Sequence, residues 1–339
     1  MNSFGRLLRV SIFGESHGEC VGITIDGCPA GLSLSPEDLL ADLERRKGGK
    51  QKGTTPRQEE DYPIFKSGVF NGKTTGFPIT ILFENKNTRS EDYNKQRSIP
   101  RPGHADWTAH QKFGGNEDYR GGGHFSARLT TGIVAAGAIA KKLMHGISIH
   151  AGVTEIGGEK DLEKGLQKAI DAKDSVGGVV ECKVTGMPVG IGEPYFDSVE
   201  SVLSHILFAI PAVRGVEFGT GFAAAKMFGS EHNDAIENMQ GKTVSNHAGG
   251  VVGGISNGND LVFRLAIKPT SSTPKEQYSL NWDTEQMENF SIKGRHDLCV
   301  ALRAPVIVEA VTALVLADFM LLEQRIPRVL PVSGIMNKE

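Results

Sequence analysis

The sequence predicts an α/β (α+β) fold built from two related halves. Two turns with similar sequences support this prediction: 26–32 (DGCPAGL) and 185–191 (TGMPVGI). Each turn follows an apolar, β-branched run and precedes a helical pattern, as in a repeated strand–turn–helix unit. We therefore expect halves near 1–145 and 146–325, followed by a short tail, 326–339.

Periodicity assigns the individual elements. Ser35 is expected to cap the first helix, and Pro36 suits its first position. The expected strands, in chain order, are 7–12, 21–25, 79–83, 147–153, 179–184 and 261–268. The expected helices are 36–47, 127–144, 162–174, 199–208 and 306–325. Two long connections, 85–109 and 229–260, show little periodicity and are rich in Gly, Asn, Ser, Arg and His. We expect them to be functional loops, because long irregular loops in compact domains usually are.

Composition excludes several classes of protein. The 339 residues are 39% hydrophobic and 23% charged, with a net charge of −3. These values argue against a disordered chain, a membrane protein and a general nucleic-acid binder. We found no apolar run of about 18 residues and no secretory leader pattern. Four scattered cysteines fit a reducing compartment, so we expect a cytoplasmic protein.

Three glycine-containing loops each carry a histidine. They are 13–18 (FGESHG), 101–106 (RPGHAD) and 120–128 (RGGGHFSAR). Histidine is the side chain best suited to proton transfer near neutral pH. One such loop alone could equally be a polar turn. Three of them, two with arginines, indicate an enzyme that acts on an anionic substrate.

Cationic residues gather in the first half of the chain. The basic stretch 45–57 could bind anions or could be a solvated helix C-terminus. The glycines of 121–123 could form an anion seat from backbone N–H groups or a packing turn. Arginine pairs readily with phosphate and carboxylate. The arginines on loops rich in glycine or proline are Arg89, Arg101, Arg120 and Arg128.

Nucleotide and metal motifs are unconvincing. Segment 219–224 (GTGFAA) has a poor βαβ context, and 68–74 (GVFNGKT) is one residue too short for a P-loop. The sequence Gly-Lys-Thr at 241–243 lacks the upstream glycine of that motif. None of the ten histidines shows zinc-protease spacing. His296 and Asp297 could be a ligand pair, but a polar loop is the better interpretation, and we predict no metal. The hydroxyl-rich segment 268–272 and the glycine-dense segment 245–254 suit a bound cofactor.

Taken in order, these segments resemble the chorismate synthase family. The motifs are 13–18, 101–106, 120–128, 245–254, 268–272 and 294–297, and the similarity runs from Gly5 to about Leu322. The resemblance implies a single domain over 1–339, folded as a β-α-β sandwich with helices between antiparallel-rich sheets. It also implies a homotetramer. The implied reaction is the 1,4-anti-elimination of phosphate from 5-enolpyruvylshikimate 3-phosphate, which gives chorismate in the shikimate pathway for aromatic amino acids.

The resemblance further implies a flavoprotein lyase. Such an enzyme requires reduced FMN, although the reaction has no net redox change. The departing hydrogen is not acidic, and a reduced flavin can donate an electron transiently and then recover it. FAD and NADP belong to the chemistry associated with such flavoproteins. With no dinucleotide fingerprint, we expect an external flavin reductant. Small phosphorylated metabolites are the expected partners, with neither nucleic acid nor membrane.

Residue roles follow from the resemblance. His17 would protonate the leaving phosphate, His104 would stabilise the reduced flavin, and Asp297 would assist flavin N5. The substrate's anions would be held by Arg46, Lys52, Arg101 and Arg128, with Ser16 and Ser126 as hydroxyl partners. The flavin would be lined by His124, Phe125, Ser126, Pro211, Ala212, Gly253, Lys268, Pro269, Thr270, Ser271, Ser272 and Arg295.

The chain departs from the family pattern at four positions. His124 and Phe125 stand where many members have arginine and serine, so a permanent positive charge is lost. Lys52 stands where arginine is expected, and Leu298 replaces a common proline. Two other kinds of protein stay open: a flavin oxidoreductase without lyase activity, and a non-catalytic binder of phosphorylated metabolites.

Overall fold

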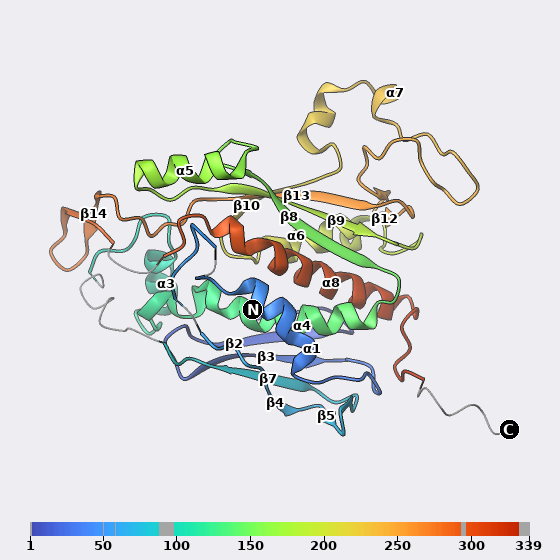
Figure 1. The fold of residues 1–339 in the computed structure, drawn as a ribbon, viewed down its shortest axis with the longest axis horizontal. Coiled ribbons are helices and arrows are strands. Elements are labelled where there is room, and N and C mark those ends of the chain that lie inside the picture. Colours follow the sequence, from blue (N-terminus) through green and yellow to red (C-terminus); the bar gives the residue numbers. More distant parts are fainter. Residues whose placement is uncertain (1, 50, 58, 88–97, 293–295, 332–339) are drawn as a thin grey trace.

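The computed structural model describes residues 2–49, 51–57, 59–87, 98–292 and 296–331. Two antiparallel sheets form the outer layers, and helices fill the space between them (Figure 1). This arrangement confirms the expected sandwich.

Each sheet has a simple antiparallel order. The first sheet runs β1 (Ser3–Phe4), β2 (Arg9–Gly14), β3 (Cys20–Asp26), β7 (Ile79–Glu84) and β4 (Ile64–Ser67). The second runs β10 (Val213–Phe218), β13 (Leu261–Ile267), β9 (Gly178–Thr185) and β8 (Ser148–Ile156). Alternate residues of β7 and β13 are buried, so each sheet presents one apolar face to the helices.

The inner layer consists of α1 (Glu37–Arg46), α4 (Thr130–Leu143), α6 (Val199–Leu207) and α8 (Ala304–Leu322). Helix α4 packs on the first sheet, α8 packs on the second, and the two helices pack on each other. Helix α8 is apolar on all sides because protein surrounds it. The expected helices and strands are confirmed to within a few residues.

Residues 300–322 are also long and apolar enough to cross a membrane, but this helix is mostly buried between the sheets. Two carboxylates interrupt its apolar surface, and both are paired within the protein. Glu309 binds Arg45 and Lys141, while Asp318 accepts backbone N–H groups from residues 6–8. These contacts are those of a core helix.

The order of elements repeats. The succession β2, β3, α1, β4, β7, α4 has the same pairing pattern as β8, β9, α6, β10, β13, α8. The two similar turns also share backbone geometry. Gly27 and Gly186 have φ of 79° and 77°, and Gly31 and Gly190 both have φ of 93°. An added Cβ at Gly27 or Gly186 would lie within about 2 Å of a backbone carbonyl oxygen, so glycine is required there.

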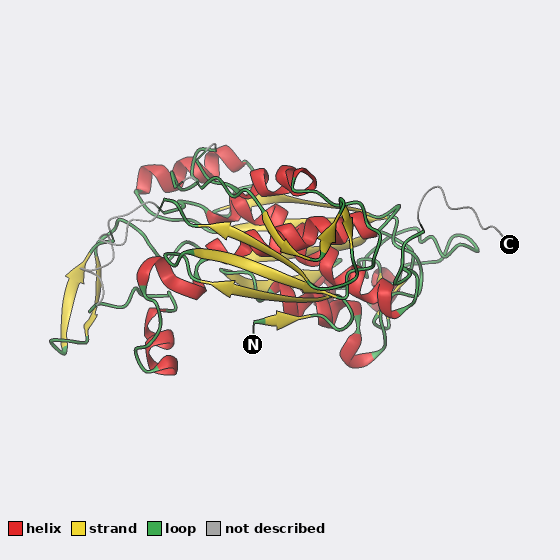
Figure 2. Ribbon diagram, turned by 90° about the horizontal axis from the view of Figure 1, so that it is seen from below, coloured by secondary structure: helices red, strands yellow, loops and turns green. Residues whose placement is uncertain are grey.

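Elements outside this plan extend from the sandwich. Helix α5 (Leu162–Ala172) packs beside β8. The hairpin β14 (Gln277–Asn281) and β15 (Gln286–Phe290) projects from one end, near α3 (Asp106–Phe113) (Figures 1 and 2). Other short elements include β5 (Val69–Phe70), β6 (Lys73–Thr74), α7 (Gly229–His232), β11 (Val251–Val252) and β12 (Ile255–Ser256).

Several sequence predictions were wrong in detail. The expected loop 85–109 contains the start of α3, and residues 88–97 lie outside the described residues. The expected loop 229–260 contains α7 and the β11–β12 hairpin. Ser35 makes no side-chain cap; instead its backbone N–H donates to the Asp38 carboxylate at 2.8 Å. The edge strand β4 was missed because its four residues are too few to show clear periodicity, and β10 was missed because its buried and exposed residues do not alternate.

Candidate active site

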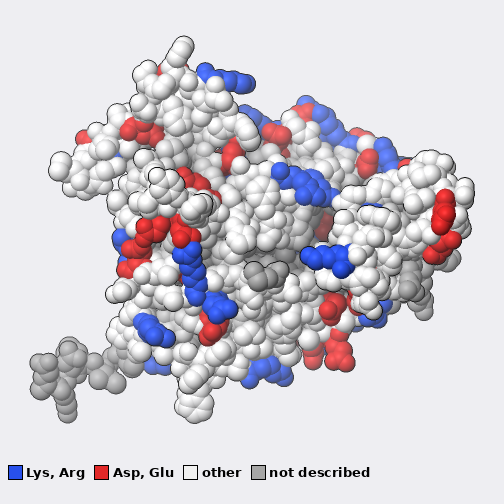
Figure 3. Space-filling view, turned by 180° about the vertical axis from the view of Figure 1, so that it is seen from behind, with Lys and Arg blue, Asp and Glu red and all other residues white. Residues whose placement is uncertain are grey.

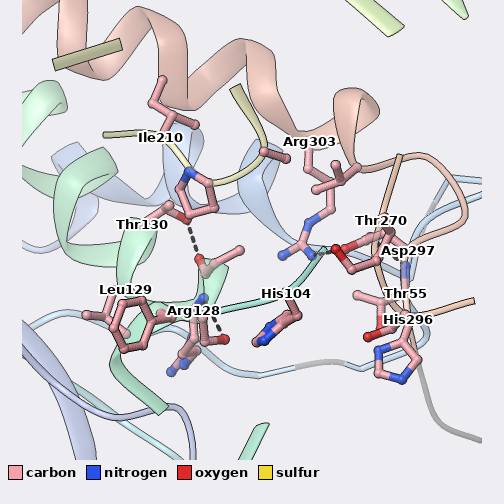
Figure 4. Close-up of a pocket in the computed structure, with 18 of the residues that line it drawn as sticks. Thr55, His104, Arg128, Leu129, Thr130, Ile210, Thr270, His296, Asp297 and Arg303 are labelled. Carbon is pink, nitrogen blue, oxygen red and sulfur yellow. Dashed lines mark hydrogen bonds and ion pairs between the residues drawn. The ribbon is translucent and has the colours of Figure 1, made fainter. Parts of the chain in front are cut away.

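The structure contains a cavity of about 550 Å³, and Figure 4 draws part of its lining as sticks. Both halves of the chain line it. The first half contributes the segment after α1, the loop 101–105, and the turns η1 (Arg120–Phe125) and η2 (Ala127–Leu129). The second half contributes 208–214, 268–272 and the approach to α8.

The wall of this cavity is strongly cationic. Three described carboxylates face eight described cations, so the cavity favours an anionic ligand. The cations are Arg46, Lys47, Arg57, Arg101, Arg128, Arg214, Lys268 and Arg303. The exterior differs: the face in Figure 3 carries acidic and basic side chains interspersed, as far as the described residues show. The excess positive charge therefore marks the cavity and not this outer face.

A buried carboxylate holds two of the arginines. Asp61 accepts from Arg46 Nη2 at 2.7 Å and also pairs with Arg128 Nη1. Arg46 comes from the end of α1 and Arg128 from η2, so Asp61 joins two elements. All three side chains are at most 5% exposed. The pair of guanidinium groups is thereby fixed in position before any ligand binds.

Burial and charge oppose each other in this cluster. Burial lowers the pKa of Arg46 to about 10, although Asp61 opposes the change. Burial alone would raise the pKa of Asp61, but the two guanidinium groups outweigh it and the net direction is down. All three groups are therefore charged at neutral pH. Two cations against one anion leave a net positive charge at the cavity wall.

Two polar atoms of the wall have no internal partner. Arg46 Nε and Thr270 Oγ1 are buried, and neither has a hydrogen-bond partner among the described residues. Both residues line the cavity. A buried donor without a partner is costly, so these atoms fit a ligand with acceptors on both sides of the cavity.

His104 is held by its own loop. Its Nδ1 lies 2.5 Å from Asp106 Oδ1, and Asp106 also forms a two-pronged ion pair with Arg101. Arg101 Nη1 also donates to Ser272 Oγ at 3.3 Å, and this hydrogen bond links the loop to the second half of the chain. In Figure 4 His104 lies between Arg128 and Asp297.

His17 and Ser16 lie behind the glycine triplet. An added Cβ at Gly121 would be 2.1 Å from His17 Nδ1 and 3.1 Å from Ser16 Oγ. Arg57 Nη1 donates to Ser16 Oγ at 3.1 Å. Burial, followed by the charge of Arg57, lowers the pKa of His17. The imidazole is therefore mostly neutral at pH 7 in the unliganded protein.

The glycine triplet thus has a packing role. The sequence left this open as one of two interpretations, the other being an anion seat. Gly121, Gly122 and Gly123 all have positive φ, between 50° and 81°. A Cβ at Gly122 would be 3.3 Å from His104 Nε2. The first two glycines therefore let the chain lie directly against the two predicted catalytic histidines.

Asp297 lies on the opposite wall. Its Oδ1 accepts from the Thr55 backbone N–H at 2.8 Å, and its Oδ2 pairs with Arg303 Nη1 at 3.0 Å (Figure 4). Arg303 Nε also donates to the Arg46 carbonyl at 3.0 Å. Asp297 is thus connected through Arg303 to the arginine cluster around Asp61.

The hydroxyl-rich segment 268–272 follows β13. Lys268 Nζ donates to Ser271 Oγ at 2.6 Å and to the Gly103 carbonyl at 2.9 Å. Burial lowers the pKa of Lys268, and Arg214 adds to the effect. Pro211, Pro269 and Ala212 complete this wall, with Ala212 in a left-handed conformation at φ 74°.

The structure does not bring every predicted residue to the cavity wall: Ser16 and His17 lie next to Gly121 but do not line the wall. Lys52 Nζ donates to Gln167 at 3.1 Å and does not line the wall. Gly253 lies in the β11–β12 hairpin, also away from the wall. Arg295 lies outside the described residues. Those predicted residues that do line the wall are Arg46, Arg101, His104, His124, Phe125, Ser126, Arg128, Pro211, Ala212, Lys268, Pro269, Thr270, Ser271, Ser272 and Asp297.

The departure at His124 has a structural consequence. Its Nδ1 lies 2.9 Å from the Gly14 carbonyl, and its Nε2 lies 3.1 Å from Asn2 Oδ1. This side chain is bonded to the N-terminal segment. Phe125 is 44% exposed and packs near Phe113.

Among the wall residues that sequence reasoning missed, four take part in the hydrogen bonds and ion pairs described above. Thr55, Arg57 and Asp61 follow α1, and Arg303 precedes α8. Arg57 belongs to the basic stretch noted from the sequence, but nothing local distinguished it from its neighbours. Arg303 stands alone among small apolar residues just before a helix, which could have been a signal. Asp61 could not be found, because its role depends on two arginines distant in sequence.

A second cavity, of about 620 Å³, lies on the other side of His104. His104, Arg101, Ala105 and Phe125 border both cavities. Its wall has one described cation and the carboxylates of Asp106, Glu117, Asp118 and Asp283. An anionic substrate therefore favours the first cavity. Among the described residues, no group of His, Cys, Asp and Glu side chains is arranged to hold a metal.

A sandwich that encloses helices and has a cavity lined by buried arginines defines a protein that binds a small anionic molecule. Residues 8–321 match the family model described as chorismate synthase. The chain therefore belongs to the chorismate synthase family.

Individual relatives agree over nearly the full length. The chain is 68% identical over 330 residues to the chorismate synthase of Chitinophaga pinensis, covering 97% of this chain and 99% of the relative. It is 45% identical over 360 residues to that of Dehalococcoides mccartyi, with coverage of 97% and 99%. A crystal structure of chorismate synthase superposes with a TM-score of 0.72 at 27% identity, covering 94% of this chain and 93% of the other. The predicted family, fold class and enzyme class are confirmed.

Proposed function

We propose that the protein converts 5-enolpyruvylshikimate 3-phosphate to chorismate and phosphate by 1,4-anti-elimination, with reduced FMN. The observation that carries the proposal is the cationic cavity of a chorismate synthase family member, in whose wall Arg46 Nε has no partner among the described residues. The substrate has a phosphate and two carboxylates, which match the surplus of cations.

The residues present fit a flavin. The cavity volume of about 550 Å³ is in the range of cofactor sites. Thr270 Oγ1 lacks a partner among the described residues, and Lys268, Ser271 and Ser272 place further polar groups on the same wall. Bound reduced FMN would supply a transient electron that helps phosphate to leave. We assign the flavin wall to Phe125, Ser126, Pro211, Ala212 and 268–272, with His124, Gly253 and Arg295 retained from the family pattern.

The substrate's anions are assigned to Arg46, Arg101 and Arg128. Each is at most 7% exposed, and Asp61 or Asp106 holds it in place. Held arginines lose little conformational freedom on binding, so preorganisation favours the anion. Ser126 and Ser16 are the assigned hydroxyl partners, and Lys52 stays a prediction from the family pattern.

His17 is the proposed proton donor to the leaving phosphate. Burial keeps the pKa of His17 low in the unliganded protein. A phosphate bound beside it would raise that pKa, because an adjacent anion favours the imidazolium. Substrate binding is therefore expected to draw a proton onto His17 at the stage when one is needed. His104 and Asp297 line the cavity as the proposed partners of the flavin.

The test is anaerobic phosphate release from 5-enolpyruvylshikimate 3-phosphate, with and without reduced FMN. We expect product only with reduced FMN, and a fall of about 10²–10⁴-fold for His17→Ala. His145→Ala, an exposed histidine beyond α4, is the matched control and should keep wild-type activity. Tight flavin binding without phosphate release would instead indicate a flavin oxidoreductase.

We further propose a cytoplasmic homotetramer that depends on an external flavin reductant. An oxidised preparation that consumes NADPH and reduces its FMN unaided would contradict the last point. Sedimentation of the purified protein tests the tetramer.

A further inference from the structure

Asp106 is the centre of four short contacts within one loop. Its Oδ2 accepts from the Arg101 backbone N–H at 3.0 Å and from Arg101 Nε at 2.7 Å. Its Oδ1 lies 2.8 Å from Arg101 Nη2 and 2.5 Å from His104 Nδ1. Asp106 is also the first residue of α3, where the helix dipole favours a negative charge.

The chemistry of these contacts decides the protonation of His104. Burial alone would raise the pKa of Asp106, but hydrogen bonds from Arg101 and His104 outweigh it and hold this pKa well below its usual range. An ionised carboxylate only accepts hydrogen bonds. At 2.5 Å from such an oxygen, His104 Nδ1 has to carry a hydrogen. Arg101 Nη2, 3.1 Å from the same nitrogen, then finds no lone pair there and donates to Asp106 instead.

We propose that Asp106 is a positioning residue that fixes His104 as the Nδ1–H tautomer. The Nε2 atom is then the free nitrogen of the ring, at the edge that lies against Gly122. Arg101, held by the same carboxylate, is positioned together with the imidazole. The consequence for catalysis rests on the proposed role of His104 beside the flavin, whereas the tautomer itself does not.

The variant Asp106→Asn tests this directly. Oδ2 receives two N–H groups from Arg101, whereas Oδ1 receives one from Arg101 and one from His104, whose ring nitrogen can also accept. The amide oxygen is therefore expected at Oδ2, with loss of the contact from Arg101 Nη2. The amide NH₂ therefore takes the place of Oδ1 and donates to His104 Nδ1. That donation moves the hydrogen to Nε2, so the tautomer is reversed while the shape of the side chain is kept.

The measurement is ¹⁵N NMR of histidine-labelled, flavin-free protein at a pH where the imidazole is neutral. His104→Gln assigns the signals by their loss. We expect Nδ1–H in the wild type and Nε2–H in Asp106→Asn. A wild-type spectrum with Nε2–H overturns the proposal, whether or not the variant folds.

Asp118→Asn is the matched control. Asp118 forms the same kind of two-pronged ion pair, with Arg120 Nε and Nη2 each at 2.8 Å, but its carboxylate does not bind His104. This variant should keep the Nδ1–H signal, and its loss would count against a specific effect of Asp106.

Phosphate release separates the two proposals. We expect about a 10²-fold lower kcat for Asp106→Asn. A reversed tautomer with unchanged kcat would support the positioning by Asp106 and overturn the proposed role of His104.

Discussion

Replacing Gly121 by alanine tests whether the position of His17 matters. The new Cβ would lie 2.1 Å from His17 Nδ1 and 2.2 Å from Cε1. Real Cβ contacts are essentially never shorter than 3.0 Å, so the ring has to move by about 1 Å. The change adds one methyl group and alters no charge.

The expected magnitude follows from that displacement. A misplacement of about 1 Å at a reacting group can lower the rate by about 10²-fold. Gly121 also has φ of 61°, where alanine costs about 1–2 kcal/mol of stability. Gly121→Ala should therefore remain folded but lose about 10²-fold in kcat/KM.

Anaerobic phosphate release measures the activity, and urea unfolding measures the stability. The matched control is Gly146→Ala, because Gly146 has φ of 79° and no described residue has an atom within 4 Å of an added Cβ. The control should show a similar loss of stability with unchanged activity.

One result would refute the reasoning. If Gly121→Ala retained activity within threefold of the wild type while staying folded, the placement of His17 against this glycine would not matter for turnover. The proposed proton transfer would then need another donor.

Three further predictions concern charged groups. Asp61→Asn should destabilise the fold by about 3–5 kcal/mol in urea unfolding, because Arg46 and Arg128 lose their buried counter-ion; a loss below 1 kcal/mol would contradict this. Glu309 has its folded pKa lowered to about 2, since Arg45 and Lys141 outweigh the effect of burial. The ionised Glu309 therefore stabilises the fold fully above about pH 4.5, and this stabilisation is lost as the pH falls toward 2. Over that range the free energy of unfolding of the wild type should fall by about 3 kcal/mol more than that of Glu309→Gln, and parallel pH profiles of the two proteins would refute this. Lys52→Ala should change the substrate KM by less than about threefold, because the side chain does not line the cavity; a larger rise would favour its assignment from the family pattern.

Predictability differed between the elements. Long periodic segments such as α5 were found from the sequence because burial of one face imposes a visible repeat. The start of α3 was missed because Gly103 and His104 indicated a loop, and Asp106 was read as part of a motif. Edge strands such as β1 and β4 have too few residues for a pattern.

The candidate site divided in a similar way. Three histidine-containing loops and the hydroxyl-rich segment 268–272 could be recognised from residue types and order alone. Asp61 and Arg303 could not, because their importance arises only where guanidinium and carboxylate groups from separate elements meet.

The sequence by itself determined the class of chemistry, the alternation of strands and helices, and the residues able to transfer protons or hold anions. These properties depend on residue type and on local periodicity. Only the tertiary structure decided which cations face the cavity and which, like Lys52, point elsewhere. It also decided that Gly121 packs against His17 and Gly122 against His104. The physical reason is that burial and ion pairing act between residues distant along the chain, and no local pattern records the partner.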